Sequence, residues 1–159
     1  SGCWYRLVGT CWFANQFTDS WSSDINEKYK EHLQRQRKRY TRSTEVWSKL
    51  EKLAFGRNVG LNGYTTPAEA KELSKTQGVP GLVLDIGSGG GWPAKDIVAR
   101  TGRSVVAMDM VLSGLQVARI QIKDAGMPEE GFKFVVGDGQ RLPFASKTFG
   151  MVVHADALC

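Results

Sequence analysis

The sequence has few residues of the kinds that build metal sites or disulfide frameworks. It contains three cysteines and two histidines among 159 residues. Cys3, Cys11 and Cys159 form no Cys-x-x-Cys pair, so we predict neither a zinc site nor a disulfide scaffold. Free thiols in a reducing cytoplasm are the expected state, and a Cys3–Cys11 disulfide is the alternative. We expect no bound metal.

A long hydrophobic run is also absent. Every apolar stretch falls short of the roughly 20 residues that a membrane-spanning helix needs. The hydrophobic content of 42% and the charged content of 23% are ordinary for a globular protein. We therefore expect a cytoplasmic protein with no membrane partner. A chain of this length can form one domain with a sizeable core.

Acidic residues are scarce in the first half of the chain relative to basic ones. Residues 1–78 hold 13 lysines and arginines against 8 acids, whereas residues 79–159 hold 8 of each. The basic excess is densest over residues 35–42. A solvated helix face is the simpler interpretation, and contact with nucleic acid or an acidic membrane surface is the alternative.

Residues 1–59 are predicted to form an aromatic flap followed by a basic helix. Six aromatic residues fall within residues 1–21 without a helical period. We interpret this stretch as a flap packed on the main body or as a lid over a substrate pocket. Residues 24–55 carry an apolar stripe at helical spacing, and Gly56 suits the end of that helix. Weak helix formers at 41–44 predict a break within it.

Residues 60–159 are predicted to form a separate α/β domain. Thr66, Pro67 and Glu69 predict a capped short helix that ends near Gly78. Two further helices are expected at 93–101, beginning on Pro93, and at 113–124, capped by Ser113. Buried strands are expected at 82–86, 104–109, 132–136 and 149–154. This alternation predicts a parallel sheet that binds ligands beyond the carboxyl ends of its strands.

A glycine-rich turn follows the first predicted strand. Residues 82–92 are Leu-Val-Leu-Asp-Ile-Gly-Ser-Gly-Gly-Gly-Trp, a buried strand that runs into glycines and then into a helix start. Glycines let the backbone approach a ligand closely, and the first turn of a helix presents free N–H groups. The turn alone is found in many α/β domains, so it does not identify the ligand.

Two acidic residues follow the next two predicted strands. Asp109 ends the second strand, where a carboxylate can accept hydrogen bonds from both hydroxyls of a ribose. Asp138 follows the third strand, where a carboxylate can accept from the exocyclic amine of a base. Together with the glycine turn, these acids predict a ligand of the nucleoside type. A nicotinamide dinucleotide is the competing ligand, but its motif requires a glycine where Trp92 stands.

The combination resembles class I S-adenosylmethionine-dependent methyltransferases, in particular those that act on small molecules. Residues 84–91 resemble the first motif of that family, residues 105–109 its acidic second motif, and residues 137–144 its third-strand loop. The resemblance covers residues 60–159 and hardly extends to residues 1–59. It implies a Rossmann-like sheet, here partial, with about four strands in the order 3-2-1-4. It also implies S-adenosyl-L-methionine as cofactor and S-adenosyl-L-homocysteine as product.

The resemblance also implies site residues. The predicted cofactor contacts are Asp85, Gly87, Ser88, Gly89, Asp109, Met110, Asp138, Gly139, His154 and Ala155. Among these, the residues of the glycine turn face the methionine part, Asp109 holds the ribose, and Met110 lies against the adenine. Tyr64 is a candidate substrate contact, and His154 is the candidate catalytic base. Such enzymes hold a nucleophile in line with the S–CH₃ bond and exclude water, without a metal.

Two departures from the family set further expectations. Gly150 stands where the family usually has an acid, and strands five to seven of the family have no counterpart in the sequence. The fourth strand is then an uncovered edge, so we expect a homo-oligomer or a second polypeptide that completes the sheet. Three functions stay open. They are small-molecule methyl transfer, a non-catalytic cofactor-binding module or fragment, and a nucleic-acid methyltransferase that uses the basic helix.

Overall fold

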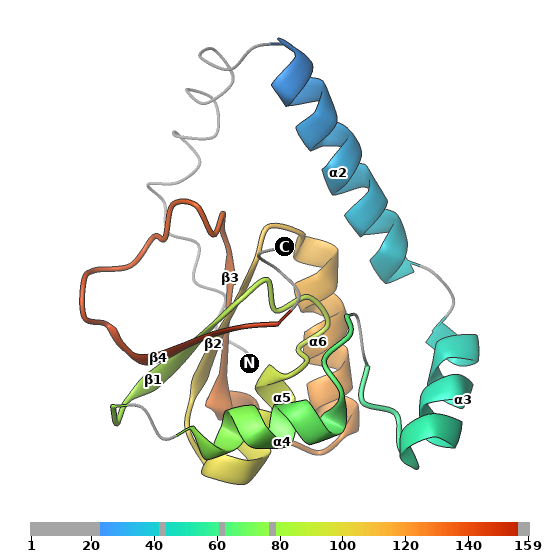
Figure 1. Cartoon of the computed structure of the whole chain (residues 1–159), viewed down its shortest axis with the longest axis vertical. Coiled ribbons are helices and arrows are strands. Elements are labelled where there is room, and N and C mark those ends of the chain that lie inside the picture. The colour runs from blue at the N-terminus through green and yellow to red at the C-terminus, as the bar shows by residue number, and fades with distance from the viewer. Residues whose placement is uncertain (1–22, 42–43, 61–62, 77–78, 156–159) are drawn as a thin grey trace.

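The computed structural model describes residues 23–41, 44–60, 63–76 and 79–155. The aromatic flap of residues 1–21, the three cysteines and the predicted helix end at Gly78 lie outside these residues. Among the helices that the structure describes, none combines the length and the apolar character needed to cross a bilayer. The described part consists of a small sheet with helices packed on it and a helical arm, which Figure 1 shows in blue and teal.

The sheet has four parallel strands in the order β3-β2-β1-β4. The strands are β1 (Leu82–Ile86), β2 (Val105–Asp109), β3 (Phe132–Val136) and β4 (Phe149–His154). The predicted bounds of β1, β3 and β4 are confirmed, and β2 begins one residue later than expected. The predicted strand order is also confirmed, which brings the loops after β1, β2 and β3 to one edge of the sheet.

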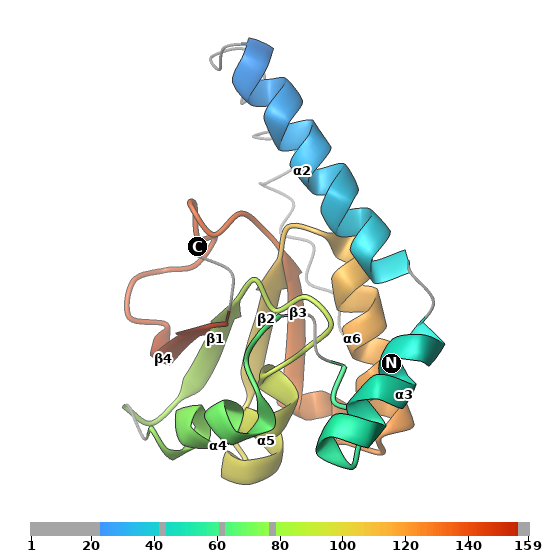
Figure 2. The same ribbon diagram turned by 45° about the vertical axis from the view of Figure 1, so that its right-hand side comes forward.

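Three helices cover one face of the sheet and bury most of the core. These helices are α4 (Pro67–Lys75), α5 (Ala94–Thr101) and α6 (Leu112–Asp124), and Figures 1 and 2 show them together below and beside the strands. Their apolar side chains, such as Ile97, Leu115 and Ile122, form one cluster with Val83, Ala107 and Phe134 of the sheet. Leu84, Val106, Met108 and Val135 alternate with these residues and form a second cluster toward the opposite face.

The predicted break in the long N-terminal helix is confirmed. Helix α2 spans Ser23–Thr41, α3 spans Thr44–Phe55, and Gly56 follows with a left-handed φ of 72°. The apolar stripe predicted along this segment is only partly covered, because Trp47 and Leu50 of α3 keep 59% and 49% exposure. Both views show α2 leaving the body near the upper end of α6. The apolar spacing therefore predicted correctly that these segments are helical. It did not predict how much of their apolar surface is buried.

Two predicted helix starts need correction. Helix α5 begins at Ala94, with Pro93 at the preceding cap position. Helix α6 begins at Leu112 after Val111, and no side chain of the cap residue bonds its first turn, so Ser113 is not the cap. Asp109 instead fixes the residue before the helix, because its Oδ1 accepts the Val111 N–H at 2.7 Å. The capping box of Thr66 and Glu69 before α4 is confirmed.

Gly150, the departure from the family pattern, has a structural explanation. It falls where the register between β1 and β4 shifts, so that Leu82 pairs with Phe149 and Val83 with Met151. Its carbonyl accepts the Val79 N–H at 3.1 Å. A Cβ at this position would lie 2.7 Å from the Pro80 carbonyl oxygen and closer still to that of Val79. Gly150 is the extra residue of a β-bulge, and any side chain there would collide with the backbone.

Candidate cofactor site

The glycine turn after β1 is fixed to the end of β2 by backbone hydrogen bonds. The N–H groups of Gly87 and Ser88 both donate to the Met108 carbonyl, at 2.8 and 3.0 Å. Gly87, Gly89 and Gly91 have φ angles of 72°, 50° and 86°, a region in which L side chains are strained. The sequence therefore needs glycine here for the shape of the turn itself.

Asp109 joins the glycine turn to the start of α6. Its Oδ2 accepts the Gly89 N–H at 2.9 Å, and its Oδ1 accepts the Val111 N–H at 2.7 Å. The side chain is 7% exposed. Burial raises the pKa of Asp109 above its usual value, and the backbone hydrogen bonds oppose that shift. Each carboxylate oxygen has a second lone pair, so this arrangement leaves acceptor capacity for a ligand.

Asp85 lies at the end of β1 and is more deeply buried, at 1% exposure. Neither of its carboxylate oxygens has a hydrogen-bond partner among the described residues, and the same holds for the Ser88 hydroxyl. Burial raises the pKa of Asp85 to about 7; the neighbouring Ser88 side chain opposes this shift, and the nearby Asp109 carboxylate adds to it. A buried carboxyl without a donor is costly when ionised, so Asp85 carries a proton for a large part of the time at neutral pH.

The third predicted loop lies at the same edge. Gly137 donates its N–H to the Asp109 carbonyl at 3.1 Å, which ties the loop after β3 to the end of β2. Asp138 closes a turn in this loop, because its Oδ1 accepts the Gln140 N–H at 2.9 Å. Gly139 lies next to β1, since a Cβ there would be 3.0 Å from Cγ2 of Ile86. The ends of three successive strands are thus joined through Asp109, as the strand order predicts.

The glycine turn, Asp109 and the loop at Asp138 form what we call the edge cluster. The predicted residues His154, Ala155 and Tyr64 lie apart from it. His154 and Ala155 line an open cavity of about 520 Å³ together with Thr65, Glu69, Glu72, Leu73 and Thr76. His154 pairs in register with Ile86, one position along from the pair of Asp85 with Val153. Its side chain therefore leaves the sheet on the opposite face from that of Asp85. Tyr64 is 87% exposed. His154 and Ala155 therefore lie at the end of β4 and line a cavity with residues of α4, whereas Asp109 and Asp138 lie at the ends of β2 and β3.

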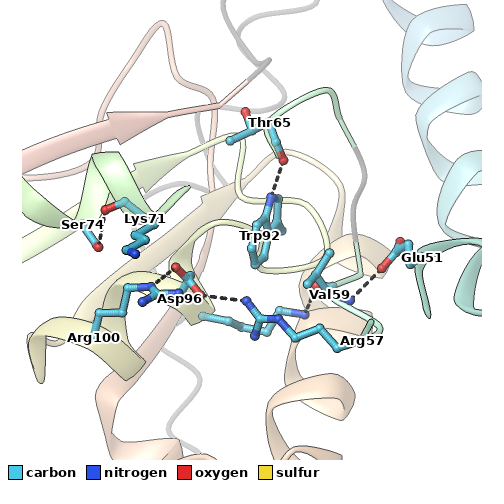
Figure 3. A network of polar contacts seen from close by, with 10 residues as sticks. Glu51, Arg57, Val59, Thr65, Lys71, Ser74, Trp92, Asp96 and Arg100 are labelled. Carbon is cyan, nitrogen blue, oxygen red and sulfur yellow. Dashed lines mark hydrogen bonds and ion pairs between the residues drawn. The ribbon is translucent and has the colours of Figure 1, made fainter. Parts of the chain in front are cut away.

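A polar network that the sequence did not reveal holds α3 and the loop after it against the sheet's helices (Figure 3). Glu51 accepts the N–H groups of Val59 and Gly60 at 2.7 and 2.8 Å. Lys95 of α5 donates to the Val59 carbonyl at 2.8 Å and also bonds Gln121 of α6. Burial lowers the pKa of Lys95 to about 8. These partners are separated by 8 to 36 positions, so spacing alone could not have paired them.

A second part of the network is centred on Asp96 of α5. This buried carboxylate accepts from Arg57 at 3.2 Å and from Arg100, one turn further along α5. Trp92 donates its Nε1–H to the Thr65 carbonyl at 2.8 Å, as Figure 3 shows. The segment before the first strand is therefore bound to the helix that follows the glycine turn. The predicted domain boundary between residues 59 and 60 lies inside this bound loop and stays a prediction.

A family model described as a methyltransferase domain matches residues 84–159, which begin in β1 and include the whole edge cluster. The matched stretch makes up just under half of the chain. The predicted resemblance to class I S-adenosylmethionine-dependent methyltransferases and the Rossmann-like fold are thereby confirmed for this part of the chain.

Curated relatives and a solved structure are similar to parts of the chain. Sterol 24-C-methyltransferase ERG6B of Gibberella zeae is 38% identical over an aligned length of 92 residues. The alignment covers 50% of this chain and 22% of that protein. Methyltransferase GfsG of Streptomyces halstedii is 33% identical over 70 residues, 44% of this chain and 25% of that protein. A structure from Methanococcus maripaludis, named as an S-adenosyl-L-methionine-dependent methyltransferase, superposes with a TM-score of 0.54 at 20% identity, covering 70% of this chain and 48% of that one. The chain spans about a quarter or less of these curated relatives.

Proposed function

We propose that this chain binds S-adenosyl-L-methionine and contributes to the transfer of its methyl group to a small-molecule acceptor. The observation that carries this proposal is Asp109, which stands at the end of β2 and holds both the glycine turn and the first turn of α6. A single carboxylate where three strand ends meet can accept hydrogen bonds from the ribose of a ligand that lies across those ends. The family match supports the reaction class.

The described residues fit the parts of this cofactor. Asp109 would accept from the ribose hydroxyls through its remaining lone pairs, and Met110 would lie against the adenine. Asp138 and Gly139 would face the adenine amine, whereas Gly87, Ser88 and Gly89 would lie along the methionine part. Two groups near the turn, the Asp85 carboxyl and the Ser88 hydroxyl, have no hydrogen-bond partner among the described residues and could bond a ligand. When bound, the cofactor supplies an electrophilic methyl group on a positively charged sulfur.

The acceptor is proposed from the curated relatives. Two of them, from Gibberella zeae and Saccharomyces cerevisiae, are named sterol 24-C-methyltransferases. These names favour a sterol or a comparable small lipid as the first acceptor to test. His154 stays the candidate base and Tyr64 a candidate acceptor contact, because the cavity beside His154 is open and is lined by the α4 segment that follows Tyr64.

Calorimetric titration with S-adenosyl-L-homocysteine tests cofactor binding directly. We expect a single site with a dissociation constant on the order of micromolar, which corresponds to about 8 kcal/mol. Transfer of a labelled methyl group is then measured with sterol, small-molecule and RNA acceptors. Binding without transfer to any acceptor would favour a non-catalytic module. Transfer to RNA with steep salt dependence would favour the nucleic-acid alternative. A chain that binds NAD and not the homocysteine product would overturn the proposal.

We also propose that β4 is completed by a second copy or another polypeptide. Among the described residues, β4 pairs with β1 alone, and Val152 in its middle is 54% exposed. An exposed strand edge carrying apolar side chains is a site for pairing. Light scattering at working concentration is therefore expected to give a mass above that of one chain. Replacement of Val152 by lysine should shift the protein toward the monomer. A monomeric wild type at the same concentration would contradict pairing with a second copy and leave another polypeptide as the partner to test.

A further inference from the structure

The side chain of Tyr40, in helix α2 of the helical arm, contacts the glycine turn. This residue stands in the last turn of α2, outside the stretch that matches the methyltransferase family. A Cβ at Gly89 would lie 2.5 Å from the Tyr40 hydroxyl oxygen, so the phenol group rests directly on the turn. Tyr40 itself is half-buried. The contact joins two segments that are about 50 positions apart in the sequence.

A second glycine makes room for the same ring. Gly114 lies in the first turn of α6, and a Cβ there would be 3.0 Å from Cζ of Tyr40 and 3.3 Å from the Gly89 carbonyl carbon. Gly114 has an ordinary helical φ, so its backbone does not require glycine. Glycine also lowers helix stability relative to alanine. The use of glycine at position 114 is explained by the space that the Tyr40 ring occupies.

The Tyr40 hydroxyl is therefore placed beside the pair that organises the candidate site. Gly89 donates its N–H to Asp109, and Asp109 is the group assigned to the ribose. A phenol hydroxyl both donates and accepts, as do the two ribose hydroxyls. The Tyr40 hydroxyl next to Gly89 can therefore hydrogen-bond a ribose hydroxyl, while the Asp109 carboxylate accepts from the ribose as well.

Resting on the proposed function, we propose that Tyr40 is a cofactor-contacting residue whose hydroxyl hydrogen-bonds the ribose beside Asp109. The arm formed by α2 thereby becomes part of the cofactor site, although the family-matching stretch does not include it. Further along α2, Tyr29 lies eleven residues before Tyr40, about 16 Å along the same helix face. Burial raises the pKa of Tyr29, and the charge of Asp138 adds to that shift, so α2 also approaches the third loop.

The test compares Tyr40→Phe with the wild-type chain by calorimetry. Two ligands are used, S-adenosyl-L-homocysteine and 5′-methylthioadenosine, which keeps the ribose and lacks the amino acid. Because phenylalanine keeps the ring and loses only the hydroxyl, we expect a folded chain with an affinity about fivefold lower for both ligands. Lys30→Ala, an exposed change on the same helix, serves as the matched control and should bind like the wild type.

A second variant probes the position of the ring. Gly114→Ala adds a methyl group against Tyr40 and favours the helix, so the chain should stay folded while affinity falls in the same direction. A wild-type chain that binds neither ligand would overturn the proposed function and this inference with it. A wild-type chain that binds, with Tyr40→Phe binding equally well, would overturn this inference alone. Loss of affinity for the homocysteine compound but not for methylthioadenosine would overturn the ribose contact.

Discussion

Replacement of Asp109 by alanine is expected to abolish measurable cofactor binding and to lower the free energy of unfolding by about 2–6 kcal/mol. The stability loss follows because two buried N–H groups, those of Gly89 and Val111, would lose their acceptor, at about 1–3 kcal/mol each. The binding loss follows because the ribose would lose a charged acceptor and the glycine turn its anchor. We expect an affinity for S-adenosyl-L-homocysteine at least about 100-fold lower, equivalent to about 3 kcal/mol.

Calorimetry and urea unfolding separate these two effects. Asp124→Ala removes an exposed carboxylate from the end of α6 and is the matched control, with wild-type binding and stability expected. Binding is compared at a temperature at which circular dichroism shows each variant folded. Equal affinity of the wild type and Asp109→Ala would refute the ribose assignment. Equal stability would show that the two backbone hydrogen bonds contribute little.

Asp85 is expected to make the protein less stable as the pH rises from about 4 to 7. Its pKa is about 7 in the folded chain and about 3.8 when unperturbed, so across this interval the folded state holds a proton that the unfolded state has released. A raised carboxyl pKa therefore favours folding at low pH, and this advantage is lost as the pH passes through 7. A shift of about three pKa units corresponds to as much as about 4 kcal/mol.

Asp85→Asn is the variant that checks this dependence. Asparagine keeps the size of the side chain and cannot ionise, so the penalty for a buried charge disappears. Urea unfolding at pH 5, 6, 7 and 8 should show the variant gaining stability relative to the wild type from pH 5 to 7, with little further gain from pH 7 to 8. Asp124→Asn should show no such trend, because that carboxylate is exposed. Parallel pH curves for the wild type and Asp85→Asn would mean that Asp85 is ionised in the folded protein.

Strong local patterns predicted the elements that form the sheet. The apolar runs at 132–136 and 149–154 are bounded by turn residues on each side, and both strands were predicted to the residue. The capping box of Thr66 and Glu69 could be predicted because its two hydrogen bonds join residues only three positions apart. Glycine and acid positions at strand ends placed the edge cluster correctly, since parallel strands must end at one edge.

Features that depend on distant partners were missed. Ser113 has the right chemistry for a cap, but α6 begins one residue before it, after a chain segment that Asp109 holds through the Val111 N–H. Glu51 and Asp96 are acids on helices that would ordinarily face water, and only tertiary packing turns them into buried acceptors. Tyr40 belonged to a predicted apolar stripe, and no sequence spacing connects it with Gly89. A glycine in the first turn of a predicted helix, such as Gly114, was the one available hint of a side chain packed against it.

The bulge at Gly150 determines to which face of the sheet each later side chain of β4 points. Because one residue is inserted there, Phe149 lies with the second core cluster, whereas Met151 and Val153 lie with the helix-covered cluster. If Gly150 were instead paired with Val83 as an ordinary strand residue, the two sides of the strand downstream would be inverted. Val153 would turn outward and His154 would be driven into the hydrocarbon interior between sheet and helices. The orientation of the only histidine near the strand ends in the described chain is thus controlled by a residue that has no side chain.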